Sequence, residues 1–274
     1  MAQPMISLRS RWIVGGGLTA LISGMYWMLN QALVNSLRPA ALVSGMVLFA
    51  FILLLALFNA RKKLPFLPLL TASAWLQVHV YAGLFAVALF LIHIGFKAPR
   101  GWLEMVLAAL FVAVSLSGVV GLAISRWVPS RLTLHGENVI FEQIPALRSR
   151  IKQEAEALAL ASLAQTQSTT IADFYEQRLR AYFERPRHLG SHLLGSSKPL
   201  HALLSEVDAL DRYLNADERK LMVEIAGLIR LKENLDFQLA AQGLLKLWLL
   251  VHIPLAGSLI LLGLIHGLFA WKFS

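Results

Sequence analysis

Five stretches of the chain are apolar over lengths that suit a membrane crossing. A helix needs roughly 20 apolar residues to cross about 30 Å of hydrocarbon. The five stretches cover residues 12–34, 40–59, 72–96, 102–124 and 247–271. This pattern predicts an all-α membrane protein in which five transmembrane helices form a bundle.

The first apolar stretch follows the basic segment SLRSR, an arrangement that also occurs in secretory signal peptides. Its apolar part is long, and no small-x-small cleavage pattern follows it. We therefore expect an uncleaved membrane anchor, which keeps this stretch as the first span.

A segment of different pattern separates the fourth and fifth apolar stretches. Its apolar residues recur at helical spacing, which predicts helices over residues 145–165, 169–187 and 215–248. We expect a threonine to cap the second helix, and the third begins with a capping-box pattern, Asn215 followed by Glu218. No proline occurs in the third before Pro254, so we expect it to continue into the fifth span. The predicted divisions are four spans in 1–126, a mostly helical insertion in 127–245 and the fifth span in 246–274.

Basic residues near the ends of the spans predict the orientation. One group comprises Arg9, Arg11, Arg61, Lys62, Lys63, Arg126, Arg131 and Lys246, and the other comprises Arg38, Lys97, Arg100 and Lys272. Five spans bring each group to one face, and the richer face is expected in the cytoplasm. We therefore expect a multi-pass protein of the bacterial inner membrane. Its N-terminus and insertion are cytoplasmic and its C-terminus is periplasmic.

Composition agrees with a membrane protein: 57% of residues are hydrophobic, 15% are charged and the mean hydropathy is +0.62. The net charge of +9 is unevenly placed. Residues 127–245 hold 14 Lys and Arg against 15 Asp and Glu, whereas the rest holds 11 against one acid, Glu104. The basic excess thus lies beside the apolar stretches, where lipid headgroups and topology signals require it. We expect no nucleic-acid partner.

The chain has no cysteine, which excludes disulfides, thiolate zinc sites, cysteine-bound iron–sulfur clusters and covalently attached haem. Four of its eight histidines lie in the predicted spans: His79 and His93 in the third, His252 and His266 in the fifth. Each pair is 14 residues apart, about 40° short of four helical turns and about 21 Å along the axis. One imidazole would lie toward each leaflet on one face of each helix. Two facing helices can supply the two axial ligands of a haem iron, although a proton relay or a transported metal would also use membrane histidines.

The segments WLQVHVYAGLFAVALFLIHIGF and WLLVHIPLAGSLILLGLIHGLF carry these pairs. They resemble the haem-bearing helices of dihaem membrane cytochromes b. The ferric reductase/NADPH-oxidase type is closer in layout than cytochrome b of quinol-oxidising complexes, because its histidine pairs also lie on the third and fifth spans. The resemblance covers the spans, about half of the chain. It implies two non-covalent b-type haems, an inner one between His79 and His252 and an outer one between His93 and His266.

The sequence departs from that family in several ways. We expect no flavin- or nicotinamide-binding domain, because the sequence continues only to Ser274 after the fifth span and no Gly-rich phosphate loop follows a strand. The quinol-site signature of a true cytochrome b is not found, and the insertion has no counterpart in the family.

Other residues allow two interpretations each. Gly83, Gly257, Gly263 and Gly267 would make room for a porphyrin or for close helix packing. The basic residues at both faces would bind haem propionates or serve only as topology signals. Glu104 would accept a proton from a quinol or lie solvated at the interface. His188 and His192 have a metal-binding spacing, but Gly190 between them and the lack of a third ligand make this pair weak.

The sequence favours a transmembrane electron-transfer subunit over a stand-alone enzyme, and we predict no catalytic residue set. It would link the quinone pool to a periplasmic redox partner such as a multihaem cytochrome c, within an oligomer or a larger complex. Two alternatives stay open. One is a quinol or metal reductase that acts at the outer haem, and the other is a non-redox scaffold or transporter.

Overall fold

The computed structural model describes residues 8–36, 40–57, 72–132, 139–166, 168–186, 190–191 and 196–273. Every regular element within these ranges is a helix, as the sequence predicts. The chain divides into two compact units. We call residues 1–122 with 248–274 the membrane unit, and residues 123–247 the insertion unit.

Among the described residues, three helices are long and apolar enough to cross a membrane, which indicates a multi-pass membrane protein. They are α4 (Ala72–His93), α5 (Trp102–Leu132) and α11 (Ala216–Phe273). The apolar helix α2 (Ala40–Ala56) has 17 residues, and α1 (Leu8–Asn35) is not among these three. The first two predicted spans therefore stay predictions, and Asn59 at the end of the second lies outside the described residues.

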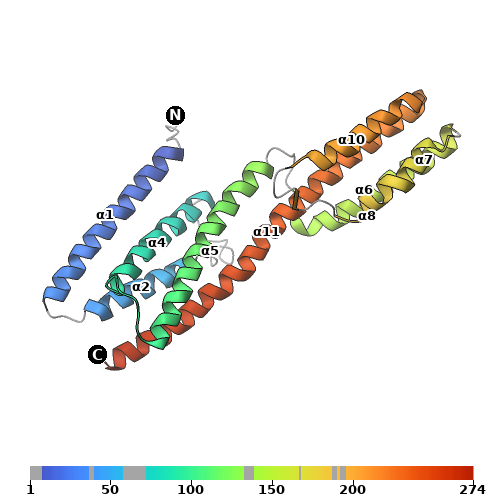
Figure 1. Ribbon diagram of the computed structural model, residues 1–274. Coiled ribbons are helices and arrows are strands. Elements are labelled where there is room, and N and C mark those ends of the chain that lie inside the picture. The colour runs from blue at the N-terminus through green and yellow to red at the C-terminus, as the bar shows by residue number, and fades with distance from the viewer. Residues whose placement is uncertain are drawn as a thin grey trace, which may run out of the picture. The chain divides into compact units, whose positions relative to one another are not determined.

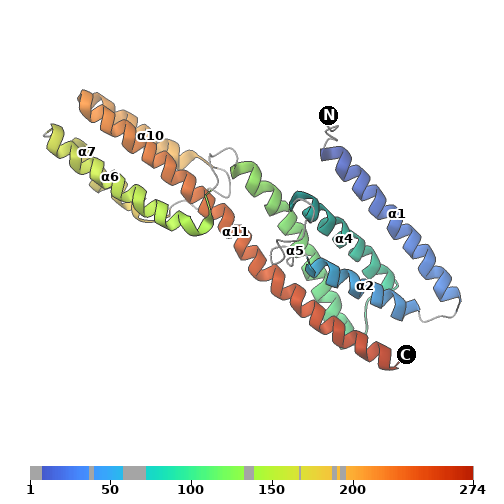
Figure 2. The ribbon, with the colours of Figure 1, turned by 180° about the vertical axis from the view of Figure 1, so that it is seen from behind.

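The membrane unit is held together by an apolar core whose buried residues come from α2, α4, α5 and α11. Leu48 of α2, Leu89 of α4 and Leu259 of α11 are buried in it. Phe90 of α4 stacks on Phe111 of α5 with ring centroids 4.3 Å apart. Both views of the ribbon show α4 between α1 and α5 (Figures 1 and 2). Close backbone approaches join α4 to α1 and α2, whereas none as extensive joins α4 to α11 within the described ranges.

The end of α4 determines where its last histidine lies. The amide of Phe96 donates to the Leu91 carbonyl at 3.0 Å, and the amide of Gly95 donates to the Ile92 carbonyl at 3.1 Å. Gly95 has a φ of 60°, so these bonds form a Schellman motif with glycine in the left-handed conformation. The motif ends α4 at His93, the final residue of the helix.

The insertion unit is a small helical bundle with its own core. Its helices are η2 (Phe141–Gln143), α6 (Ile144–Thr166), α7 (Thr170–Phe174), the π-helical η3 (Tyr175–Leu179), α8 (Arg180–Glu184), α10 (Lys198–Leu210), η4 (Asp211–Tyr213) and the first part of α11. In both views α6 and α10 lie alongside the first half of α11 (Figures 1 and 2). Ile144, Leu179, Ile225 and Ile229 are fully buried between them. The expected threonine cap is wrong: the Thr169 side chain makes no capping bond, and the amide of Thr170 donates to the Ser168 hydroxyl instead.

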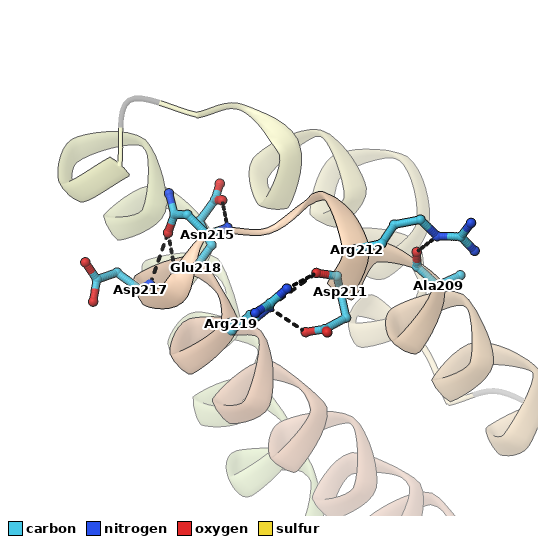
Figure 3. Close-up of polar contacts among 7 residues, drawn as sticks. All are labelled: Ala209, Asp211, Arg212, Asn215, Asp217, Glu218 and Arg219. Atoms are coloured by element: carbon cyan, nitrogen blue, oxygen red, sulfur yellow. Dashed lines mark hydrogen bonds and ion pairs between the residues drawn. The ribbon is translucent and has the colours of Figure 1, made fainter.

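The predicted capping box at the start of α11 is confirmed (Figure 3). The Asn215 side-chain oxygen accepts from the amides of Asp217 and Glu218 at 3.0 and 2.9 Å. The Glu218 carboxylate accepts from the Asn215 amide at 2.8 Å in return. Arg219 also binds Asp211 at 3.1 Å, which fixes the preceding turn. From this cap, α11 continues as a single 58-residue helix that includes Pro254.

A buried cluster of charges lies inside the insertion unit. Lys232 and Asp236 are fully buried, and the Lys232 ammonium donates to Asp236 at 2.5 Å. Arg148 of α6 lies 3.0 Å from the other carboxylate oxygen of Asp236. The Tyr182 hydroxyl donates to Glu233 at 2.8 Å, and its ring lies 3.9 Å beneath the Lys232 ammonium. Burial lowers the pKa of Lys232 and raises that of Tyr182, because a low-dielectric environment disfavours their charged forms.

Candidate functional site

The histidine rings of one predicted pair face each other in the membrane unit. His93 closes α4, and His266 lies in the last two turns of α11. Their ring centroids are 6.5 Å apart, and the ring planes are nearly perpendicular at 80°. This is an edge-to-face arrangement within the usual range of centroid distances for ring pairs.

A cavity of about 1280 Å³ opens beside this pair. Its walls come from α2, α4, α5 and α11 and are mainly apolar, with Phe49, Phe90, Phe111 and Trp271 as the aromatic members. Ligand pockets usually measure about 300–1,000 Å³, so this space is large enough for a bulky planar ligand. Its charged lining residues are Lys97, Arg100 and Glu104, all from the turn after α4 or the start of α5.

Helix α2 supplies two neighbouring residues that hold the His93 ring. The Ser44 hydroxyl lies 3.1 Å from His93 Nδ1 and is itself only 2% exposed. At Gly45, an added Cβ would come within 2.9 Å of His93 Cε1. The absence of a side chain at position 45 therefore lets the ring lie against the α2 backbone.

The second pair, His79 and His252, lies on the same two helices, 14 residues before the first pair. The Ser117 hydroxyl of α5 lies 3.1 Å from His252 Nδ1. The Trp248 indole donates to the Ser117 carbonyl at 2.9 Å and stacks on His252 with centroids 5.0 Å apart. An added Cβ at Gly121 would come within 2.0 Å of Trp248, so this glycine permits α5 and α11 to meet.

The four glycines proposed to make room for a porphyrin behave differently from one another. An added Cβ at Gly83, Gly257 or Gly267 would meet no described atom within 4 Å, so these positions border open space. Gly267 also lines the cavity. At Gly263 an added Cβ would meet the Phe49 ring at 3.3 Å, and helix packing accounts for this glycine.

The basic residues near the span ends also differ in their surroundings. On the predicted outer side, Lys97 and Arg100 line the cavity, whereas Lys272 lies near the Phe273 ring. On the predicted inner side, Lys246 pairs with Glu142 of the insertion unit at 2.5 Å. Among the other basic residues of the inner side, Arg61, Lys62 and Lys63 lie outside the described residues. The side chains of Arg9, Arg11 and Arg131 are not described either.

Glu104 lines the cavity and accepts a hydrogen bond from the Gly101 amide at 3.3 Å. This bond gives Glu104 a structural role as a cap at the start of α5. Its position in the cavity is also compatible with the second interpretation, that it accepts a proton from a quinol. The weak pair His188 and His192 lies outside the described residues. Within the ranges that are described, no three His, Cys, Asp or Glu side chains gather into a metal-binding group. A haem iron requires only two protein ligands, so this finding does not bear on the histidine pairs.

Sequence reasoning proposed the four histidines as ligands but missed the residues of other helices that contact His93, His252 and Trp248. Ser44, Gly45, Ser117 and Gly121 are small residues in apolar helices, where their usual roles are local. One signal could have singled them out: each is a serine or a glycine that lies at the same height in the bundle as a histidine or its neighbour on another helix. That signal becomes readable only when the neighbouring helix is known.

Comparison with models of known families, with curated proteins and with solved structures found no match to this chain.

Proposed function

We propose that this chain is a b-type dihaem membrane subunit that carries electrons between the quinone pool and a periplasmic redox partner. The observation that carries the proposal is the His93–His266 pair, with ring centroids 6.5 Å apart at the edge of an apolar cavity. The second pair, His79 and His252, lies 14 residues away from the first on the same two helices. Two haems held about 21 Å apart along these helices would span about two thirds of the hydrocarbon.

The distance between the rings supports a shared metal. A bond from a metal to an imidazole nitrogen is about 2.0–2.1 Å long, and the ring centre lies roughly 1.1 Å beyond that nitrogen. Two imidazoles on opposite sides of one metal therefore have centres about 6–6.5 Å apart. The observed 6.5 Å agrees with this value.

The surroundings support a porphyrin around that metal. The cavity walls are mainly apolar, and their charged residues are two cations, Lys97 and Arg100, and one acid, Glu104. A haem has the same polarity, with an apolar ring and two carboxylates on one edge, so these two cations would hold the propionates of the outer haem. Gly267 borders open space in the same cavity, where a side chain would take up room that the ring needs.

The donor set favours electron transfer over oxygen or substrate chemistry. A haem with two histidine ligands supplies one-electron transfer, because its iron keeps no open position. The protein holds the ligands within an apolar bundle, which sets the potential through burial and through hydrogen bonds to the rings. Quinol is the electron donor that a membrane supplies, and a multihaem cytochrome c is a suitable acceptor at the outer face.

A reduced-minus-oxidised optical spectrum of the purified full chain tests the proposal. We expect a b-type α band and two haems per chain. His93→Ala and His266→Ala should each remove the outer haem, leaving about half of the absorbance. His201→Ala is the matched control, because His201 is an exposed histidine of α10. A wild-type chain without a b-type band, or a band unchanged in both variants, would overturn the proposal in favour of a scaffold or transporter.

One observation favours a second function, a quinol or metal reductase that acts at the outer haem. Glu104 lines the same cavity as His93 and His266, where its carboxylate could take a proton from a quinol. The purified chain should then oxidise a quinol or reduce a ferric chelate without any cytochrome c. If turnover needs an added cytochrome c, the electron-transfer subunit is the correct assignment.

A further inference from the structure

We propose that Ser44 and Ser117 are positioning residues, one for each haem, which hold His93 and His252 by Nδ1 and lower the potentials of the two haems. The inference rests on the proposed function. Each serine lies on a different helix from the histidine that it contacts, Ser44 on α2 and Ser117 on α5. Both contacts measure 3.1 Å, and both involve the same ring nitrogen.

At Ser44 a neighbouring carbonyl favours one direction of the hydrogen bond. The Ser44 hydroxyl lies 3.0 Å from the Ala41 carbonyl and can donate to it. With its single proton placed there, the hydroxyl oxygen accepts from His93. A metal on Nε2 requires the same arrangement, because the neutral His93 ring then carries its proton on Nδ1.

At Ser117 the indole of Trp248 also contacts the hydroxyl oxygen. Trp248 Nε1 lies 3.2 Å from the Ser117 hydroxyl oxygen and can only donate to it. His252 Nδ1 approaches the same oxygen. With a metal on Nε2, the neutral His252 ring carries its proton on Nδ1 and donates it to Ser117. The hydroxyl oxygen can accept both bonds, because it has two lone pairs.

A purely local role does not account for these serines. Serines in membrane helices usually bond the carbonyl three or four residues earlier, as Ser23 does with Thr19 at 2.8 Å. Ser44 makes that local bond and in addition reaches a histidine 49 residues away. Within the described ranges no hydrogen bond reaches the ring of His266, so His93 is the ligand of the outer pair that a serine orients.

The hydrogen bond has a defined electronic effect. Donation from Nδ1–H makes the imidazole a stronger base and so stabilises ferric iron more than ferrous iron. Its loss should raise the potential of the haem concerned. We expect Ser44→Ala to shift the reduction equilibrium of the outer haem toward the ferrous form by about threefold to tenfold, or ~28–59 mV for one electron. Ser117→Ala should shift the inner haem in the same direction.

The experiment is a redox titration of the purified full chain at the haem α band, with haem content measured in parallel. Ser23→Ala is the control for loss of a local serine bond, and Ser44→Thr keeps the hydroxyl. We expect one potential to rise in each alanine variant, a different one in each, and neither to change in Ser23→Ala. If Ser44→Ala loses the outer haem, the inference requires Ser44→Thr to retain it.

The outcomes separate the inference from the function beneath it. Unchanged potentials in both alanine variants with full haem content would overturn the inference and leave the haem assignment standing. Loss of the outer haem in Ser44→Thr as well as in Ser44→Ala would also overturn it, because the hydroxyl would then not be the relevant group. A wild-type chain without haem would overturn the proposed function itself.

Discussion

Gly45 illustrates how much of this site depends on single residues. It follows Ser44 on α2, and its missing side chain leaves room for the His93 ring. Real Cβ atoms almost never approach another heavy atom to the 2.9 Å that alanine would require here.

We therefore predict that Gly45→Ala displaces the His93 ring and lowers the outer haem content, so that the chain retains roughly one haem in place of two. The haem-to-protein ratio of the purified variant measures this. Gly24→Ala on α1 is the matched control, since an added Cβ there meets no described atom within 4 Å. Full haem content in Gly45→Ala would show that the ring can move without losing its metal.

The histidine spacing could be read from the sequence, because 14 residues at helical pitch place two side chains on one face wherever the helix lies. The serines and glycines that contact these histidines or their neighbours could not be read from it. Ser44, Gly45 and Ser117 matter through helices that the sequence does not place beside one another. Their residue types are common in membrane helices, so composition does not single them out.

At the scale of elements, α11 differs most from what its charges suggest. Lys232, Glu233 and Asp236 resemble the solvated face of a helix, yet each is at least 92% buried, with exposures of 0, 8 and 0%. Arg148 and Tyr182 from α6 and α8 complete the cluster. Burial of charge is costly unless each group finds an opposite partner, so the balance within this cluster decides its stability.

We predict that Asp236→Leu destabilises the insertion unit by about 3–5 kcal/mol, because it leaves two buried cations without their shared carboxylate. Lys232→Met should cost less, since Asp236 keeps its ion pair with Arg148. Thermal unfolding of the full chain, followed by loss of helical circular dichroism, measures the order. Lys220→Met is the control, because Lys220 pairs with Asp217 at the surface and its loss should change little. Equal costs for Asp236→Leu and Lys220→Met would contradict a cluster held by charge balance.

At the scale of the whole molecule, the absence of cysteine allows a direct test of the predicted orientation. Single cysteines can be placed at Phe273 near the C-terminus and at Asp217 near the start of α11, both exposed in the structure. We predict that an impermeant maleimide labels Phe273→Cys from the periplasm. Asp217→Cys should react only after the inner membrane is opened, and the wild-type chain should not react at all. Labelling of both variants from the same side would contradict the predicted topology.

The sequence by itself determined the helical class, three of the five predicted spans, the cap of α11 at Asn215 and the spacing of the histidines. These features depend on local composition and on the helical period, which act along the chain. The tertiary structure alone decided that a cavity opens beside His93 and His266, that serines from α2 and α5 reach His93 and His252, and that the charges of α11 are buried. Those features depend on which helices become neighbours, and packing between distant segments makes that choice.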